Sequence, residues 1–205
     1  MVIDGIYYAL ALSAGGALLW NLIHPAFAAP LFLLALFCLY FFRDPDRNIP
    51  DGAVAVSPAD GKVVSVIGDS AEYTRISIFL NIFDVHVNRA PIAGKITNIE
   101  YTQGRFLVAS REIASAQNER NMFTIAGTVA GETTCVRFAQ IAGLIARRIV
   151  CYKKPGDAVA KGERVGLIKF GSRVDVFLGP EWDIAVRTGE RVAGGSSILA
   201  RRRLS

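Results

Sequence analysis

Cysteine and histidine are scarce in this chain of 205 residues, which has three cysteines and two histidines. Cys38, Cys135 and Cys151 form no CxxC pair and have no histidine nearby, so neither a disulfide framework nor a thiolate zinc site is expected. Reduced thiols of a cytoplasm-facing protein fit this pattern better. With only His24 and His86, multi-histidine metal sites are excluded, no metal is expected, and few side chains could serve as a base near neutral pH.

Charge is missing from a long stretch at the N-terminus, because no Asp, Glu, Lys or Arg occurs in residues 5–42. Two apolar runs, 5–23 and 26–42, are separated by the helix breaker His24-Pro25, which predicts a hairpin of two helices. Each run is near the lower length limit for crossing a bilayer. We therefore expect residues 1–42 to be a membrane anchor, with His24 as a polar residue of the turn.

The charges that flank this segment predict its orientation. Arg43 and Arg47 follow the second run, whereas the turn carries no Lys or Arg, so the positive-inside rule places the rest of the chain on the cytoplasmic face of the cell membrane. A signal peptide is disfavoured, because the first residues lack a positive charge and the apolar run is too long. A re-entrant or interfacial segment is the alternative, since Pro30 and Gly15-Gly16 weaken both helices.

Residues 43–205 have the composition of a mildly basic globular domain, and short β-type runs between turn residues dominate it. The pattern predicts a mainly β domain, or a β-rich α+β one, and argues against a doubly wound α/β fold. Helices are expected only around 106–116 and 141–146. The predicted strands are 53–58, 62–67, 74–80, 95–101, 122–130, 133–139, 164–170 and 173–178.

Two segments, 56–66 and 153–171, each place a turn rich in Gly and Asp before a strand, as the halves of barrel-sandwich domains do. The lipoyl and biotinyl carriers share that architecture, but neither segment supplies the lysine context that such carriers need. We therefore expect a barrel-sandwich-like fold without carrier chemistry.

Three strings carry a resemblance that no single one would: FFRDPDRNIP with VSPADGKV (41–63), IFLNIFDVHVNRAPIAGKI (78–96) and KGERVGLIKFGSRVDVFL (161–178). In this order, with NERN (118–121) and IAGLIARRI (141–149) between them, they resemble the short, membrane-anchored phosphatidylserine decarboxylase proenzymes. The resemblance implies a lyase of phospholipid biosynthesis that forms phosphatidylethanolamine and CO₂. It also implies a zymogen, in which a serine attacks the preceding carbonyl and becomes an N-terminal pyruvoyl cofactor. That carbonyl would form a Schiff base with the substrate amine and act as the electron sink for decarboxylation.

The cleavage motif of the family maps to Gly171-Ser172, because KFGS precedes an apolar strand here as it does in the family. Autocatalytic cleavage would give a β chain, 1–171, and an α chain, 172–205, that stay associated. A turn dipeptide is the plain alternative for Gly171-Ser172. A second candidate, Gly195-Ser196-Ser197, lacks the preceding strand and would leave a very short α chain.

His86, in FDVHVNRAP, is the histidine to which the resemblance assigns proton transfer, first as the base toward Ser172 and then as the acid that reprotonates the substrate. A structural imidazole is the alternative. Asp60 in SPADG would orient His86 as the acid of a triad, although turn capping would also explain it. Asp84, two residues before His86, is a second candidate acid, and the sequence leaves both open.

The chain departs from the longer bacterial form of the family at Arg89, where that form has a second histidine. Arg89 could instead bind the substrate phosphate or carboxylate. Further substrate-binding candidates are Asn118, Arg120, Asn121 and the pair Arg147-Arg148, and surface solvation is their alternative role.

The expected partners are a membrane phospholipid and the membrane itself. The basic tail 201–203 favours anionic lipid head groups, and nothing indicates nucleic-acid binding. A homodimer is implied by the resemblance alone. Two other functions remain open: a non-catalytic, membrane-tethered barrel-sandwich adaptor or carrier, and a pyruvoyl decarboxylase of a soluble amino acid, which the apolar anchor disfavours.

Overall fold

The computed structural model describes residues 1–68, 72–144, 148–169 and 171–203. It contains two compact units, Met1–Asp46 and Arg47–Ser205. The sequence pattern had placed this division at residue 42.

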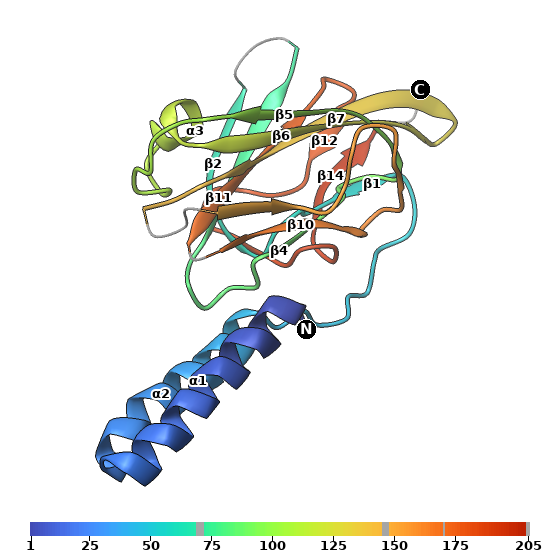
Figure 1. The fold of residues 1–205 in the computed structure, drawn as a ribbon. Helices are drawn as coiled ribbons and strands as arrows, with labels where there is room; N and C mark the ends of the chain where they lie inside the picture. Colours follow the sequence, from blue (N-terminus) through green and yellow to red (C-terminus); the bar gives the residue numbers. More distant parts are fainter. Residues whose placement is uncertain (69–71, 145–147, 170, 204–205) are drawn as a thin grey trace. The chain divides into compact units, whose positions relative to one another are not determined.

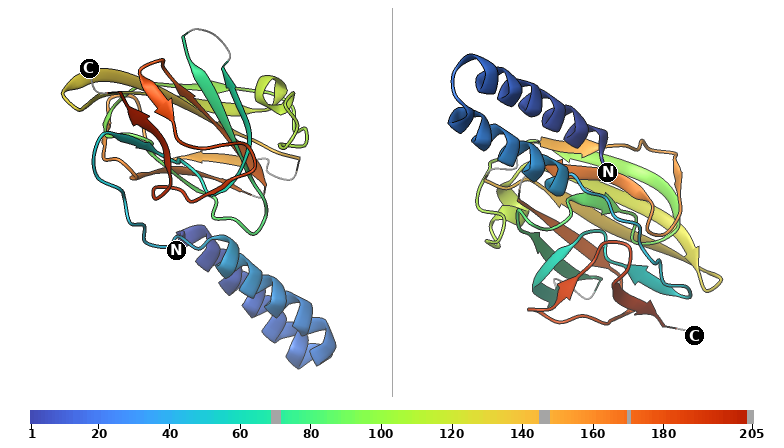
Figure 2. Two further views of the ribbon diagram at one scale, coloured as in Figure 1. Left: turned by 180° about the vertical axis from the view of Figure 1, so that it is seen from behind. Right: turned by 90° about the horizontal axis from the view of Figure 1, so that it is seen from below.

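The first unit is the expected hairpin of apolar helices, α1 (Ile3–Leu22) and α2 (Pro25–Phe41), which lie side by side (Figure 2). His24 caps α2, because its Nδ1 accepts the Ala26 N–H at 3.2 Å, and Pro25 occupies the first turn, where no N–H is needed. Among the described helices, α1 alone is long and apolar enough to cross a membrane, and α2 is shorter.

The second unit is built on a sheet of eight antiparallel strands. Its central strand, β11, pairs with β3 on one side, where Ser172 lies opposite Leu80, and with β7 on the other. The order is β13 (Arg191–Val192), β2 (Gly61–Gly68), β3 (Thr74–Leu80), β11 (Ser172–Leu178), β7 (Glu132–Ile141), β6 (Arg120–Val129), β5 (Gly94–Thr102) and β9 (Ala158–Val159).

Two small antiparallel sheets complete the unit, and Figure 1 shows β10 and β4 on the other side of it from β5, β6 and β7. One sheet has the order β1 (Val54–Val56), β14 (Ile198–Arg202) and β12 (Trp182–Ile184). The other has the order β4 (Val87–Arg89), β10 (Arg164–Lys169) and β8 (Arg148–Cys151).

The hydrophobic core draws side chains from all three sheets. The rings of Phe123 on β6 and Phe138 on β7 stack at 4.7 Å, and both are fully buried. Because side chains alternate along a strand, Val174, Val176 and Leu178 of β11 face this core, and Ser172 lies on the same face.

The prediction of a mainly β domain behind a helical hairpin is confirmed, and each predicted strand matches an element, with Phe170 outside the described residues. The helix predicted over 106–116 is reduced to α3 (Ala114–Gln117). The helix predicted over 141–146 is wrong over its described part, because Ile141 still belongs to β7 and Ala142 donates its N–H to Glu119 O of another segment at 2.9 Å. Residues 145 and 146 lie outside the described residues.

Candidate active site

The predicted cleavage dipeptide lies where the chain enters the central strand. Gly171 has a φ of +69°, a conformation that favours glycine, and Ser172 begins β11. Ser172 is fully buried, and within the described residues its Oγ has no hydrogen-bond partner. A buried hydroxyl without a partner is costly, so such a group indicates a functional role or an atom held ready to react.

His86 lies in the loop between β3 and β4 and contacts this dipeptide directly. Its ring is 1% exposed, and Nε2 lies 3.0 Å from the Gly171 nitrogen, while Nδ1 lies 2.9 Å from the carbonyl oxygen of Asp84. A peptide N–H can only donate and a carbonyl can only accept, so these two partners assign the proton to Nδ1 and the lone pair to Nε2. His86 Nε2 therefore accepts the N–H of the peptide that immediately precedes the predicted cleavage site.

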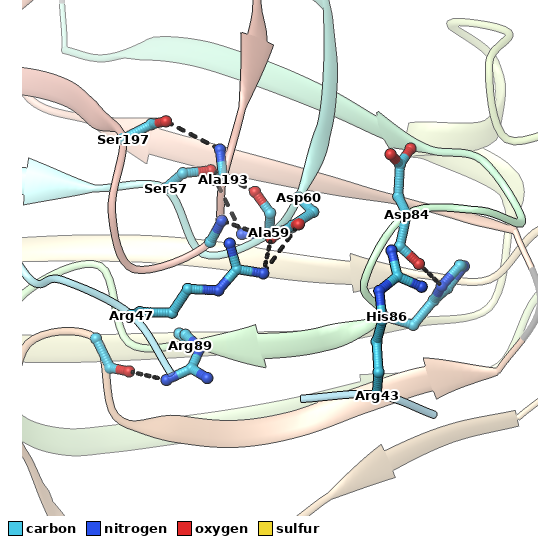
Figure 3. A network of polar contacts seen from close by, with 12 residues as sticks. Arg43, Arg47, Ser57, Ala59, Asp60, Asp84, His86, Arg89, Ala193 and Ser197 are labelled. Carbon is cyan, nitrogen blue, oxygen red and sulfur yellow. Dashed lines mark hydrogen bonds and ion pairs between the residues drawn. The ribbon is translucent and has the colours of Figure 1, made fainter. Parts of the chain in front are cut away.

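Neither candidate acid contacts His86 through its carboxylate in the described structure. The carboxylate of Asp84 points away from the His86 ring, as Figure 3 shows. It pairs with Arg191 and accepts the Asn81 N–H. The main-chain carbonyl of Asp84, and not its carboxylate, bonds to His86 Nδ1, and a Ser-His-Asp triad stays a prediction.

Asp60 is held by a different part of the second unit. Its carboxylate pairs with Arg47 at 2.9 Å (Figure 3). The same carboxylate accepts the Gly194 N–H at 2.7 Å. These contacts tie the turn before β2 to the turn before β14, which also contains the alternative cleavage site Gly195-Ser196-Ser197. A role for Asp60 in proton transfer remains a prediction.

Arg89, on β4, is 7% exposed and donates from Nη1 to the carbonyl of Gly162 at 3.0 Å. It lies on the same short segment as His86, three residues further along. Binding of a phosphate or carboxylate by this buried guanidinium stays a prediction.

The structure disperses the other predicted substrate-binding residues. The side-chain amide of Asn118 bonds to main-chain groups of the protein. It accepts the Leu107 N–H and donates to the carbonyls of Leu107 and Ala142, at 2.8–2.9 Å. Asn121 is buried and bonds to Gln140. Arg120 donates to the Ser115 carbonyl and lines a pocket of about 220 Å³ beside Asp175, and Arg147 lies outside the described residues.

Sequence reasoning missed a buried ion network next to Ser172, on the face of β11 opposite the core. Arg173, fully buried, binds Asp175 at 2.6 Å, the hydroxyl of Ser77, and Glu112 at 3.1 Å. Arg75 binds Glu112 and lies 3.7 Å from Asp175, so two positive and two negative charges balance. The signal in the sequence was a pair of charges two residues apart in an otherwise apolar strand.

The ion network lowers the pKa of the Glu112 carboxyl group. Burial raises its pKa, but the hydrogen bond and charge of Arg173, together with Arg75, outweigh burial and hold the pKa below its ordinary value. The ionised form of Glu112 is therefore the one that the folded protein favours.

Comparison with known proteins identifies relatives along nearly the whole chain. A family model described as phosphatidylserine decarboxylase matches residues 34–200. A protein of Solibacter usitatus named phosphatidylserine decarboxylase proenzyme is 65% identical over 202 residues, which are 98% of this chain and 97% of that protein. Proteins with the same name from Syntrophus aciditrophicus and Cupriavidus pinatubonensis are 44% and 45% identical, over 96% and 91% of this chain and 94% and 90% of their own lengths.

Proposed function

Because the chain belongs to the phosphatidylserine decarboxylase family, we propose that it removes CO₂ from the serine head group of phosphatidylserine and releases phosphatidylethanolamine. We further propose that it first cleaves itself between Gly171 and Ser172, so that Ser172 becomes a pyruvoyl group. One observation carries this proposal: the buried Ser172 hydroxyl has no hydrogen-bond partner in the described structure, and the Nε2 lone pair of His86 faces the adjoining peptide.

The self-cleavage step that we propose uses the side chains of Ser172 and His86. His86 Nε2 takes the proton of Ser172 Oγ while Oγ bonds to the carbonyl carbon of Gly171, and the leaving nitrogen of Ser172 receives that proton as the C–N bond breaks. The resulting ester loses the Gly171 carboxylate when the Cα proton of Ser172 is removed. Water then replaces the nitrogen, which leaves as ammonia, and the carbonyl remains at the new N-terminus.

The residues around Ser172 suit such a group. The pyruvoyl carbonyl supplies an electron sink for the electrons released with CO₂. We propose that His86 returns a proton to the substrate carbon and that Arg89 binds the phosphate or carboxylate of the head group. We leave Asn118 out of this role, because both donated bonds of its side-chain amide already go to main-chain carbonyls, whereas substrate binding by Arg120 and Asn121 stays a prediction.

The topology keeps the cleaved chains together. Residues 172–205 would supply β11, the central strand, whose partners β3 and β7 belong to residues 1–171. Separation of the chains would break both ladders and expose Val174 and Val176. We therefore expect the two cleaved chains to stay associated, and a homodimer likewise stays a prediction.

The apolar hairpin explains how the enzyme reaches its substrate. We propose that α1 and α2 hold the enzyme at the cell membrane, with the β domain on the cytoplasmic side that Arg43 and Arg47 favour. The substrate then never has to leave the bilayer.

Intact mass spectrometry of the wild type and of Ser172→Ala tests the proposal. We expect chains of residues 1–171 and 172–205 in the wild type, a pyruvoyl terminus on the smaller one, and a single chain in Ser172→Ala. Ser196→Ala, at the other Gly-Ser dipeptide, is the matched control and is expected to cleave. Wild-type protein should then release CO₂ from phosphatidylserine vesicles but not from free serine.

An uncleaved and inactive wild type, inserted in membranes, would refute the proposal and favour the tethered adaptor. Release of CO₂ from free serine at the rate seen with vesicles would favour a decarboxylase of soluble amino acids instead.

A further inference from the structure

Gly143, just beyond the end of β7, lies against the carbonyl that self-cleavage would attack. A Cβ atom added to Gly143 would lie 2.3 Å from the oxygen and 3.2 Å from the carbon of Gly171. Gly143 has no left-handed backbone conformation, so glycine is required here by space and not by φ. The Gly171 carbonyl therefore packs directly against the backbone of Gly143, where a side chain would not fit.

Asn118 fixes the position of that backbone. Its Nδ2 donates to the carbonyls of Ala142, the neighbour of Gly143, and of Leu107, both at 2.8 Å, and its Oδ1 accepts the Leu107 N–H at 2.9 Å. The Ala142 N–H also donates to Glu119 O at 2.9 Å. Asn118 is 1% exposed, so its amide is a buried cross-link between two loops.

The loop that contains Leu107 also contains Ala109, which lies on the other side of Gly143. The Cβ of Ala109 lies 3.2 Å from the position that a Gly143 Cβ would occupy, so Gly143 is enclosed by Ala109 and the Gly171 carbonyl. A methyl group at residue 143 would have no room to shift toward Ala109. The Gly171 carbonyl would therefore have to rotate out of its present direction.

The other main-chain group of Gly171, the N–H of the preceding peptide, is held by His86, whose Nε2 accepts it. The N–H and the C=O of Gly171 thus have separate, rigid neighbours, while the attacking Oγ of Ser172 is bound by no described partner. This division suits an intramolecular attack, in which the carbonyl must hold its direction and the nucleophile must be able to move.

We propose that Gly143 and Asn118 are positioning residues for self-cleavage, which fix the direction of the Gly171 carbonyl so that its carbon faces the Ser172 hydroxyl. This inference rests on the proposed self-cleavage. It replaces the substrate-binding role that the sequence pattern predicted for Asn118.

The test compares Gly143→Ala with Gly68→Ala in the full chain, synthesised without cells in the presence of lipid nanodiscs and sampled over time for its two products. A Cβ added at Gly68 would meet no atom of the described residues within 4 Å, and Gly68 also lacks a left-handed conformation, so it is a matched control. We expect Gly143→Ala to cleave about tenfold to a hundredfold more slowly than Gly68→Ala, since a misplacement of about 1 Å can cost about a hundredfold in rate.

A second readout separates positioning from a general loss of structure. If the first attack is slowed, the ester does not accumulate, and hydroxylamine, which cleaves esters, will not restore product formation in Gly143→Ala. The melting temperature of Gly143→Ala in the uncleavable Ser172→Ala background should stay close to that of Gly68→Ala in the same background. Should Gly143→Ala fail to fold, Asn118→Asp decides the question, because it keeps the acceptor oxygen and loses both donated bonds. It is expected to cleave slowly.

Cleavage of Gly143→Ala at the rate of Gly68→Ala, or rapid cleavage of Gly143→Ala on addition of hydroxylamine, would overturn the inference. In the case where Gly143→Ala does not fold, fast cleavage by Asn118→Asp would do the same. A wild type and a Gly68→Ala variant that both stay intact would refute the proposed self-cleavage itself, and the inference with it.

Discussion

Replacement of Arg173 by methionine tests the buried ion network beside the cleavage site. In the uncleavable Ser172→Ala background, Arg173→Met leaves Asp175 buried without its main partner, since the two side chains are 0% and 1% exposed. Breaking a buried pair in this way costs about 3–5 kcal/mol. Asp175 would retain the Ser115 hydroxyl at 2.6 Å and Arg75 at 3.7 Å, so we expect the lower end of this range.

Thermal unfolding of the full chain in detergent, followed by near-UV circular dichroism, measures this loss. For a unit of this size, about 3 kcal/mol corresponds to a fall in melting temperature of roughly 6–12 °C. The double variant Arg173→Met/Asp175→Leu is the control, because removal of both charges should restore about half of the loss or more. A fall of under about 2 °C in the single variant, or no recovery in the double variant, would refute the reasoning.

Two further predictions concern stability in the same Ser172→Ala background. Because the folded protein holds the pKa of Glu112 below its ordinary value of 4.5, the stabilisation from Glu112 is complete above that pH and is lost as pH falls through the lowered pKa. Melting curves of Glu112→Gln should therefore lie below those of the parent at pH 7 and approach them below pH 4.5, and a constant difference would contradict this. Phe123→Ala, which removes one ring of the stacked pair in the core, should cost about 3–5 kcal/mol in urea unfolding. Phe83→Ala, at a side chain 63% exposed, is its control and should change stability by under about 0.5 kcal/mol.

The local pattern was sufficient for the helical hairpin and for the longer strands. An uncharged stretch interrupted by His24-Pro25 has few alternatives to a pair of helices, because Pro25 lacks the N–H that a continuous helix would need there. Runs such as 74–80 alternate in the manner of strands, and β3 has these bounds. The two- to five-residue strands β4, β8, β9, β12, β13 and β14 were not predicted, since they are too short to show a period and exist through their partners.

In the candidate site, too, some features were predictable from local sequence and others depend on contacts between distant segments. The sequence named Gly171-Ser172 and His86 as separate motifs, and the pairing of β3 with β11 brings them together across more than 80 residues of chain. The contact between His86 and the carbonyl of Asp84 is invisible to reasoning about side-chain types, because a main-chain oxygen is present at every residue.

The helix expected from Ile141 onward failed for a related reason. Apolar residues there are compatible with a helix, but the backbone groups of Ala142 bond to Glu119 and Asn118 from another part of the chain. Propensity is weak beside two such bonds in a buried place.

Residue types and their order along the chain were enough to indicate which side chains carry reactive groups and where a long apolar segment lies. The bonds of Asn118 to a neighbouring loop, the buried pair of Arg173 and Asp175, and the space that Gly143 leaves for the Gly171 carbonyl became evident in the folded protein alone. Composition and period are properties of neighbours along the chain. Burial, hydrogen-bond partners and close approach depend instead on residues that folding brings together from far apart.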